Sequence, residues 1–366
     1  MQLFNESDMR KIVYGLLMFA LMGCRPSTLE WGKELLAEKN YEKAKETLSL
    51  WIQSDTTRWD AYYARAESNL ALDLEQDALL DYEKAFAMHP TAQTCSGVGK
   101  GYKGKEDYEK AKAYFNQAIG MDRSHAEAYL GLGNVYLQEE QWDESLLYLN
   151  QAKERWKDTL KEELSLAYMK VYFEKKDDEA CLEQASLLKR AKVPPSEAYE
   201  YAGQVYTRQK RYAQAQKEYQ KALVLDPTNI FAMALVADVL AKQEDFKTEI
   251  LLRTRIIRQA EEQQAKAELI GMSYFYRAVA KDHVGDFKGA LQDLDHSIAL
   301  SDGRAWAYFS RAVAKIHLKD MSGALLDYLR AINLEPDVAF DDYLTEDPKS
   351  FSGFWAYAKK QGLSLL

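Results

Sequence analysis

The sequence predicts an all-α solenoid of about nine stacked helical hairpins, closed by a C-terminal capping helix. Three observations support this fold class. A small residue that opens the second helix of each hairpin recurs every 33 to 35 residues at seven of eight steps. In most units another small residue lies 12 positions before it, and a large residue follows it by four. Only 7 prolines and 18 glycines occur in 366 residues, which suits long helices.

The most regular unit spans Ala305 to Val338 and reads as two amphipathic helices joined by a short turn. Ala312 and Ala324 are small enough for the two helix backbones to approach closely. Tyr328 is the bulky residue that fills the space beside them. The unit ends near Pro336, because proline cannot continue a helix.

The same pattern is repeated along the chain. The residue that opens the second helix is found at Ala44, Ala78, Ala111, Ser145, Ala180, Ala215, Glu249, Ala290 and Ala324. This period and these correlated positions resemble the tetratricopeptide repeat (TPR) family over about residues 25–338. The resemblance implies a right-handed superhelix whose inner groove is lined by the first helix of each hairpin. It also implies a structural role for Arg65, Arg277 and Arg311, which match a common arginine of the family.

Two irregularities divide the chain. Pro194–Pro195 follows a weakly matching fifth unit and predicts a bend between two lobes. The step before Ala290 holds seven extra residues, and residues 261–266 are rich in helix formers, which predicts lengthened helices rather than a flexible linker. The predicted domains are a lipoprotein-type signal peptide at 1–23, an N-terminal lobe at 24–193, a C-terminal lobe at 194–336, and a tail with a capping helix at 337–366.

The N-terminus has the composition of a secretory signal. Arg10 and Lys11 precede Ile12–Met22, an apolar run of 11 residues that is too short to cross a bilayer of about 30 Å as a helix. The sequence before Cys24, Leu-Met-Gly, resembles the bacterial lipobox, which implies cleavage and acylation at Cys24. The alternative is an ordinary cysteine near a buried N-terminal helix. Lipidation implies attachment to the bacterial cell envelope, with the periplasmic side of the outer membrane favoured.

The composition argues against several functions. A net charge of −9 and a pI near 5.3 disfavour a nucleic-acid binder, which usually has a basic face. No HExxH, GxSxG or GxxxxGK[ST] motif occurs, and the five histidines have no metal-ligand spacing. We therefore predict no catalytic residue, no metal site and no cofactor. Cys95 and Cys181 are predicted to be buried free thiols, since they lie two repeats apart.

The predicted binding groove is apolar near the C-terminus and more polar upstream, where Lys100 and Lys103 face it. Clustered aromatic side chains with polar neighbours are typical of protein-binding hot spots. The candidate groove residues are Phe275, Tyr276, Trp306, Phe309, Val313 and His317. In the alternative interpretation, a C-terminal helix at Ser352–Gln361 folds back and fills this groove as core.

Together these features predict a non-enzymatic, membrane-anchored scaffold that binds a protein or peptide partner of the cell envelope in its concave groove. The alternative function is glycan capture by a surface lipoprotein, because helix-pair repeats also occur in proteins of that class. Such proteins carry large non-repeat insertions, and this chain has almost none.

Overall fold

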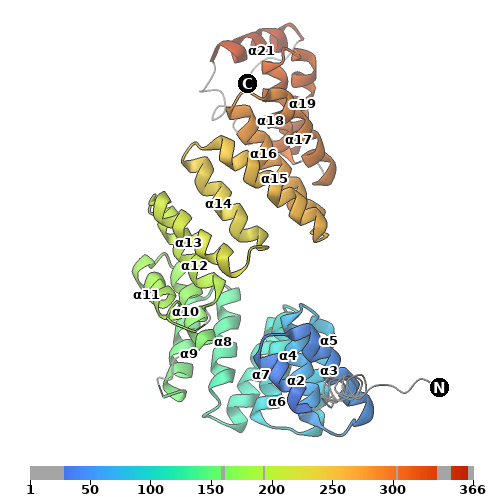
Figure 1. Ribbon diagram of the computed structural model, residues 1–366, viewed down its shortest axis with the longest axis vertical. Coiled ribbons are helices and arrows are strands. Elements are labelled where there is room, and N and C mark those ends of the chain that lie inside the picture. Colours follow the sequence, from blue (N-terminus) through green and yellow to red (C-terminus); the bar gives the residue numbers. More distant parts are fainter. Residues whose placement is uncertain (1–28, 158–160, 193, 302–303, 336–347, 362–366) are drawn as a thin grey trace, which may run out of the picture. The chain divides into compact units, whose positions relative to one another are not determined.

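The computed structural model describes residues 29–157, 161–192, 194–301, 304–335 and 348–361. Within these ranges the regular structure consists of 19 helices, without a strand (Figure 1). Successive helices pack against each other as hairpins, and each hairpin packs on the next within its unit. The predicted fold class, an all-helical repeat solenoid, is confirmed.

The chain forms two compact units, unit 1 at Met1–Asp177 and unit 2 at Asp178–Leu366. The helices of unit 1 are α2 (Leu29–Ala37), α3 (Tyr41–Ser54), α4 (Trp59–Ala71), α5 (Glu75–Met88), α6 (Ala92–Gly104), α7 (Tyr108–Met121), α8 (Ala126–Gln138), α9 (Trp142–Arg155) and α10 (Glu162–Glu174). The helices of unit 2 are α11 (Asp178–Leu188), α12 (Ser196–Arg208), α13 (Tyr212–Leu225), α14 (Ile230–Lys242), α15 (Phe246–Glu262), α16 (Ala267–His283), α17 (Phe287–Leu300), α18 (Ala305–His317), α19 (Met321–Leu334) and α21 (Pro348–Lys360).

The boundary between the two units falls at Asp177–Asp178, inside the fifth predicted repeat. Helix α11 packs against α12 and so belongs with the helices that follow. Pro195 takes the N-cap position of α12, with an extended backbone at φ −67° and ψ 142°. A proline fits this position because the first N–H groups of a helix have no partner within it.

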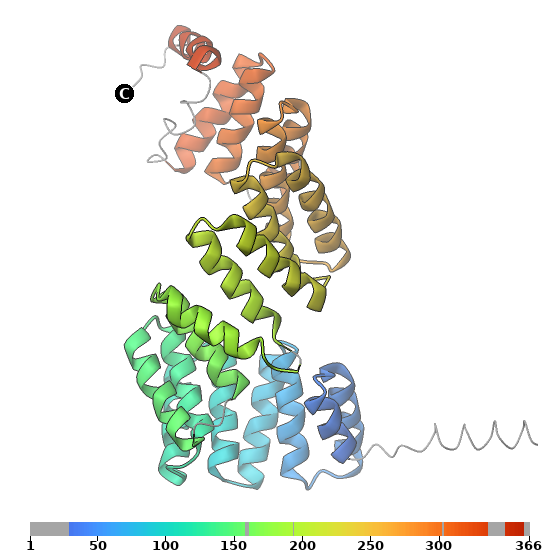
Figure 2. The same cartoon turned by 60° about the vertical axis from the view of Figure 1, so that its left-hand side comes forward.

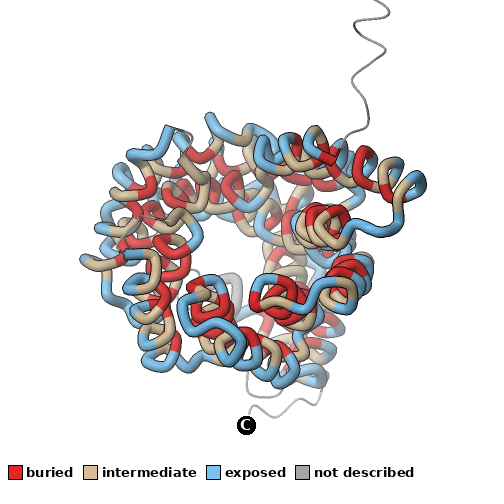
Figure 3. The backbone as a smooth tube through the Cα atoms, turned by 90° about the horizontal axis from the view of Figure 1, so that it is seen from below, coloured by how far each residue is buried: buried red, intermediate tan, exposed pale blue. Residues whose placement is uncertain are grey.

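The core of each hairpin follows the small-and-large pairing that the sequence predicts. A Cβ atom added at Gly133 would lie 2.6 Å from the Leu149 side chain, and one at Gly203 would lie 2.4 Å from the Tyr219 ring. Leu149 and Tyr219 are at most 1% exposed. The glycines therefore let each large side chain of a second helix pack against the backbone of the first. Buried residues gather on the helix sides that face neighbouring helices (Figure 3).

The seven extra residues lengthen two helices, as predicted. Helices α15 and α16 each have 17 residues, whereas the other helices of hairpins have 9 to 14. The connection between them is short and contains Gln264 at φ 53°. Figure 2 shows these two helices lying side by side, and they are in direct contact.

Helix α21 closes the stack of unit 2 by packing against α18 and α19. Its Phe354 and Ala358 are at most 1% exposed and share a core cluster with Phe309. A terminal repeat needs such a cap because its outer apolar face has no following hairpin.

Both described cysteines are buried free thiols, as predicted. The Cys95 thiol lies 3.4 Å from the carbonyl oxygen of Tyr114, and burial raises its pKa to about 11. Cys95 is therefore a thiol rather than a reactive thiolate at neutral pH.

Candidate functional site

Three of the predicted groove residues form one aromatic cluster in unit 2. The rings of Phe275 on α16 and Trp306 on α18 meet edge to face, with their centres 4.0 Å apart. The Tyr276 ring lies 5.3 Å from that of Phe275 and remains 39% exposed. We call Phe275, Tyr276 and Trp306 the aromatic surface. It joins two adjacent first helices, which is the geometry that the sequence pattern predicts for an inner face.

The buried Arg253, which pairs with two carboxylates, lies over the Tyr276 ring. The Arg253 guanidinium lies 4.7 Å from the centre of the Tyr276 ring, although Arg253 is only 3% exposed. It donates hydrogen bonds to Asp238 at 2.5 Å and to Glu249 at 3.3 Å. Burial raises the pKa of Glu249, which Arg253 partly offsets. One feature of the sequence indicates this network, namely the charged Glu249 at a position that is small in the other repeats.

Phe309 and Val313 lie with the core rather than on the aromatic surface. Phe309 is 2% exposed, its ring centre is 6.0 Å from that of Tyr328, and it shares a cluster with Phe354 of α21. Val313 packs against the same cluster. Phe309 is therefore buried in the core between α18, α19 and the capping helix α21. The prediction of Phe309 as a contact residue needs this correction, because an aromatic side chain buried under a capping helix cannot meet a partner.

His317 is positioned by the preceding repeat, because Phe287 begins α17 and His317 ends α18 of the next hairpin. Its ring stacks on Phe287, with centres 4.2 Å apart and an interplanar angle of 8°. His283, the equivalent residue one repeat earlier, stacks on Phe246 at 4.3 Å and 7°. This recurrence assigns the histidines a packing role beside the hairpin turns. Among the described residues, no three His, Cys, Asp or Glu side chains gather in a way that could hold a metal ion.

The predicted lipidation site, Cys24, lies outside the described residues. In the part of the chain that the structure does describe, no helix is both long enough and apolar enough to cross a bilayer.

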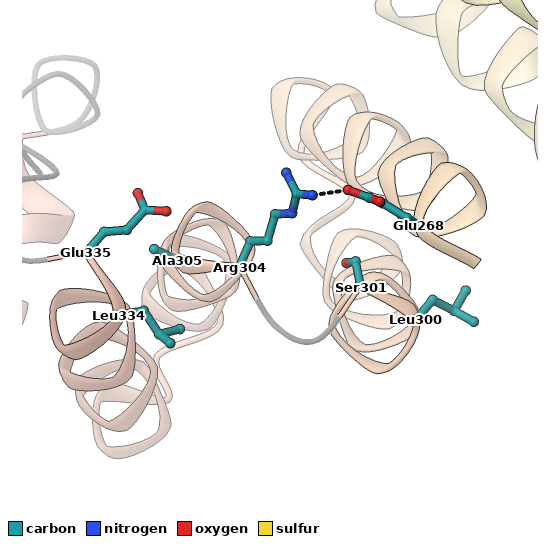
Figure 4. A pocket seen from close by; sticks show the side chains of 7 residues that line it. All are labelled: Glu268, Leu300, Ser301, Arg304, Ala305, Leu334 and Glu335. Atoms are coloured by element: carbon teal, nitrogen blue, oxygen red, sulfur yellow. Dashed lines mark hydrogen bonds and ion pairs between the residues drawn. The ribbon is translucent and has the colours of Figure 1, made fainter. Parts of the chain in front are cut away.

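A cavity of about 440 Å³ lies in unit 2 where α16, α17, α18 and α19 begin or end (Figure 4). Arg304 points toward Glu268 and forms an ion pair with it. Ser301 donates a hydrogen bond to the carbonyl oxygen of Ser297 at 2.6 Å. Because the cation and the hydroxyl donor already have partners, this cavity is a weak candidate for a polar ligand.

A second cavity, of about 360 Å³, lies within unit 1. It was not predicted as a site, although Lys100 and Lys103 were expected to face the groove. Its lining combines charged, amide and apolar side chains from α4, α6, α7, α8 and α10 and from the connection between α9 and α10. The lining residues are Glu67, Leu70, Lys100, Lys103, Phe115, Glu127, Leu130, Gly131, Asn134, Trp156, Lys161 and Glu163.

Comparisons with solved structures find helical repeat proteins of low sequence identity. The Cut9–Hcn1 hetero-tetramer of the APC/C matches with a TM-score of 0.51 and 15% identity, over 83% of this chain and 52% of the matched chain. This chain thus spans about half the length of that protein. PilF from Pseudomonas aeruginosa matches with a TM-score of 0.45 and 18% sequence identity, over 70% of this chain and 97% of the matched chain. A tetratricopeptide repeat protein from Parabacteroides merdae matches with a TM-score of 0.47 and 14% sequence identity, over 67% of this chain and 96% of the matched chain.

Comparisons by sequence find fewer matches than the comparison with solved structures. None of the curated proteins matches the chain. Tetratricopeptide repeat families match residues 99–158 and residues 196–229. The first match lies in unit 1 and the second covers α12 and α13 of unit 2. Both units of the chain therefore contain tetratricopeptide repeats, a motif that generally mediates protein–protein interactions.

Proposed function

We propose that this protein is a non-enzymatic scaffold that binds a protein or peptide partner through the aromatic surface of unit 2. The observation that carries the proposal is the cluster in which Phe275 joins a partly exposed Tyr276 to Trp306 across two adjacent first helices. Large aromatic side chains lose little conformational entropy on binding and bury much area, so they dominate binding energy in protein interfaces. The partner supplies apolar side chains to this surface.

The place of action that we propose is the bacterial cell envelope, with a lipid anchor at Cys24. Support comes from the sequence alone, namely the positive residues, the short apolar run and the Gly23–Cys24 pair. Each buried methylene of an acyl chain contributes about 0.8 kcal/mol, so more than one chain gives stable attachment. The scaffold would then hold its partner at a membrane surface, on the periplasmic side of the outer membrane.

The binding proposal is tested by crosslinking and pull-down from envelope fractions. Tyr276→Ala combined with Trp306→Ala should lose the partners that the wild type captures. Tyr274→Ala is the matched control, because Tyr274 lies on the same helix but stacks on His296 at 4.9 Å. Phe309 is left unchanged, since its truncation would open a cavity in the core. Identical partner sets for wild type and double variant would refute the aromatic surface.

The anchor is tested separately by Cys24→Ala. The variant should move from the membrane fraction to the soluble fraction, and continued membrane association would contradict lipidation. Binding to a glycan array without any protein partner would favour the glycan-capture alternative over the scaffold.

A further inference from the structure

We propose that the partner segment held on the aromatic surface carries a basic side chain, which pairs with Asp238 beside Tyr276. This inference rests on the proposed function, and it adds a charge to the apolar side chains already assigned to the partner. Asp238 lies on α14, the first helix of the hairpin that precedes α16. Both helices belong to unit 2.

A single guanidinium joins Asp238 to the aromatic surface. The Arg253 group that donates to the Asp238 carboxylate at 2.5 Å also lies 4.7 Å from the centre of the Tyr276 ring. An extended peptide advances about 3.3 Å per residue, so two or three residues are enough to reach both the ring and the carboxylate. A basic and an apolar side chain of one short segment can therefore bind here at the same time.

The charges around Arg253 do not balance. Its guanidinium has two carboxylate partners, Asp238 at 2.5 Å and Glu249 at 3.3 Å. With both carboxylates ionised, the three groups carry one net negative charge. Arg253 and Glu249 are each 3% exposed and neutralise one another inside the protein, whereas the Asp238 side chain is 52% exposed. The excess negative charge therefore meets solvent at Asp238.

The other cations near this surface do not supply the missing charge. Lys242 lies one helical turn beyond Asp238 on α14, but the two side chains form no ion pair within the described ranges. At the start of α18, Arg304 is already paired with Glu268. The Oδ1 atom of Asp238 accepts from Arg253, while its Oδ2 atom accepts no hydrogen bond from any residue that the structure describes. A cation from outside can therefore pair with Oδ2.

A lysine or arginine of the partner fits both features of this place. Its cationic group pairs with Asp238, and its methylene stem lies along apolar surface such as the exposed part of the Tyr276 ring. When the neighbouring apolar side chains of the partner bind, they remove water from the carboxylate, which strengthens its attraction for a cation. A neutral side chain at the same position would leave the carboxylate poorly solvated, and an acidic one would be repelled. The surface therefore selects a basic residue among large apolar ones.

The test uses the full chain and three capped peptides in calorimetric titrations. Acetyl-Ser-Phe-Ser-Lys-Ser-Phe-Ser-amide places its lysine and both phenylalanines on one face of an extended chain. Gln or Glu replaces this lysine in the other two peptides. We expect the lysine peptide to bind about fivefold more tightly than the glutamine peptide, the upper end for an ion pair that stays partly exposed. The glutamate peptide should bind most weakly. Raising sodium chloride from about 0.05 M to about 0.5 M should remove most of these differences.

Variants separate the carboxylate from the aromatic rings. Asp238→Asn should abolish the preference for the lysine peptide and leave the affinity for the glutamine peptide nearly unchanged, whereas Asp238→Glu should keep most of the preference. The thermal unfolding midpoint of Asp238→Asn should stay near that of the wild type, since Glu249 still pairs with the buried Arg253. Glu244→Gln is the matched control, because it removes an exposed negative charge from the turn after α14 and should leave the preference intact. Tyr276→Ala should weaken all three peptides alike.

Several outcomes would overturn the inference. Two of them are equal affinities for the lysine and glutamine peptides, and no detectable binding of the lysine peptide at millimolar concentration. A preference that survives in Asp238→Asn would also refute it, as would one that does not fall with salt, which the wild type alone decides. If Tyr276→Ala combined with Trp306→Ala loses its captured partners while the peptides show no charge preference, the proposed function stands and only the charge of the partner is wrong. If that double variant retains all partners, the proposed function fails and this inference with it.

Discussion

The Arg311 guanidinium clamps the Asp327 carboxylate across the α18–α19 hairpin. Nε donates to Oδ2 at 2.8 Å and Nη2 donates to Oδ1 at 2.6 Å. The same bidentate pair, sixteen residues apart, joins Arg65 to Asp81 and Arg277 to Asp293. The structural role that the resemblance implied for these arginines thus has a geometric basis. Each clamp fixes one second helix against the first helix of its hairpin.

Breaking one clamp should destabilise unit 2. Arg311→Met should lower the free energy of unfolding by about 2 kcal/mol, because it removes two charge-assisted hydrogen bonds from a carboxylate that is only 5% exposed. This loss of stability is smaller than for an arginine–aspartate pair without a second cation, since Lys315 still lies 2.7 Å from Asp327. Urea unfolding in a double-mutant cycle with Asp327→Asn measures the coupling. Strictly additive effects would show that the clamp contributes nothing.

A methyl group at the close helix contact should also destabilise the fold. In Gly203→Ala the new Cβ would lie 2.4 Å from the Tyr219 ring, so the helices must separate, at a cost of about 1–3 kcal/mol. Gly120→Ala on α7 is the control, and we expect it to stabilise rather than destabilise the protein, because nothing lies within 4 Å of its added Cβ. It should raise stability by about 0.5–1 kcal/mol through helix propensity. Circular dichroism during urea unfolding measures both, and equal effects would argue against close packing at Gly203.

Glu67 should make unit 1 sensitive to acid. Burial raises its pKa, but the charge and hydrogen bond of Lys100 outweigh this and hold the pKa below the usual 4.5. A carboxyl group whose pKa is lower in the folded protein than in the unfolded chain stabilises the fold at any pH above its unfolded-state pKa. This stabilisation is lost as the pH falls through its folded-state pKa. Relative to wild type, Glu67→Gln should therefore be less stable at pH 7, and the difference should shrink below about pH 4.5.

Thermal unfolding between pH 3 and pH 7 checks the Glu67 prediction. Glu109→Gln serves as control, because Glu109 is 85% exposed and its ion pair with Lys112 is on the surface. A difference between wild type and Glu67→Gln that does not change with pH would contradict the role of Lys100.

The hairpin turns offer a stabilising substitution. The second residue after the first helix of each hairpin has positive φ at every described turn, and only Gly285 is a glycine there, at φ 79°. Lys319 occupies the equivalent position at φ 65°, where a side chain is strained. Lys319→Gly should raise the free energy of unfolding by about 0.5–1 kcal/mol, and Gly285→Lys should lower it by a similar amount. Equal stability for both variants would exclude strain at these turns.

The repeat spacing was sufficient to predict the hairpins, the small-and-large pairs such as Gly203 and Tyr219, and the lengthening of α15 and α16. These features depend on residues within one hairpin, where 12 to 16 positions of sequence separate the partners. Local periodicity encodes such contacts directly, because each side chain is placed by its own helix. The lipid anchor at Cys24 and the envelope location remain predictions from the sequence.

Only the tertiary structure decided whether each candidate binding residue is buried in the core, paired with another side chain or exposed. Phe309 and Trp306 occupy similar inner-face positions in the sequence pattern, yet α21 joins Phe309 in the core, while the Trp306 ring meets Phe275 of the preceding repeat. Lys100 and Lys103 look alike in the sequence, yet only Lys100 meets Glu67, 33 residues away on another hairpin. The sequence by itself determined the repeat architecture, because its contacts are local and periodic. Packing between repeats determined which side chains are buried, paired or available, because those contacts join residues that no local pattern connects.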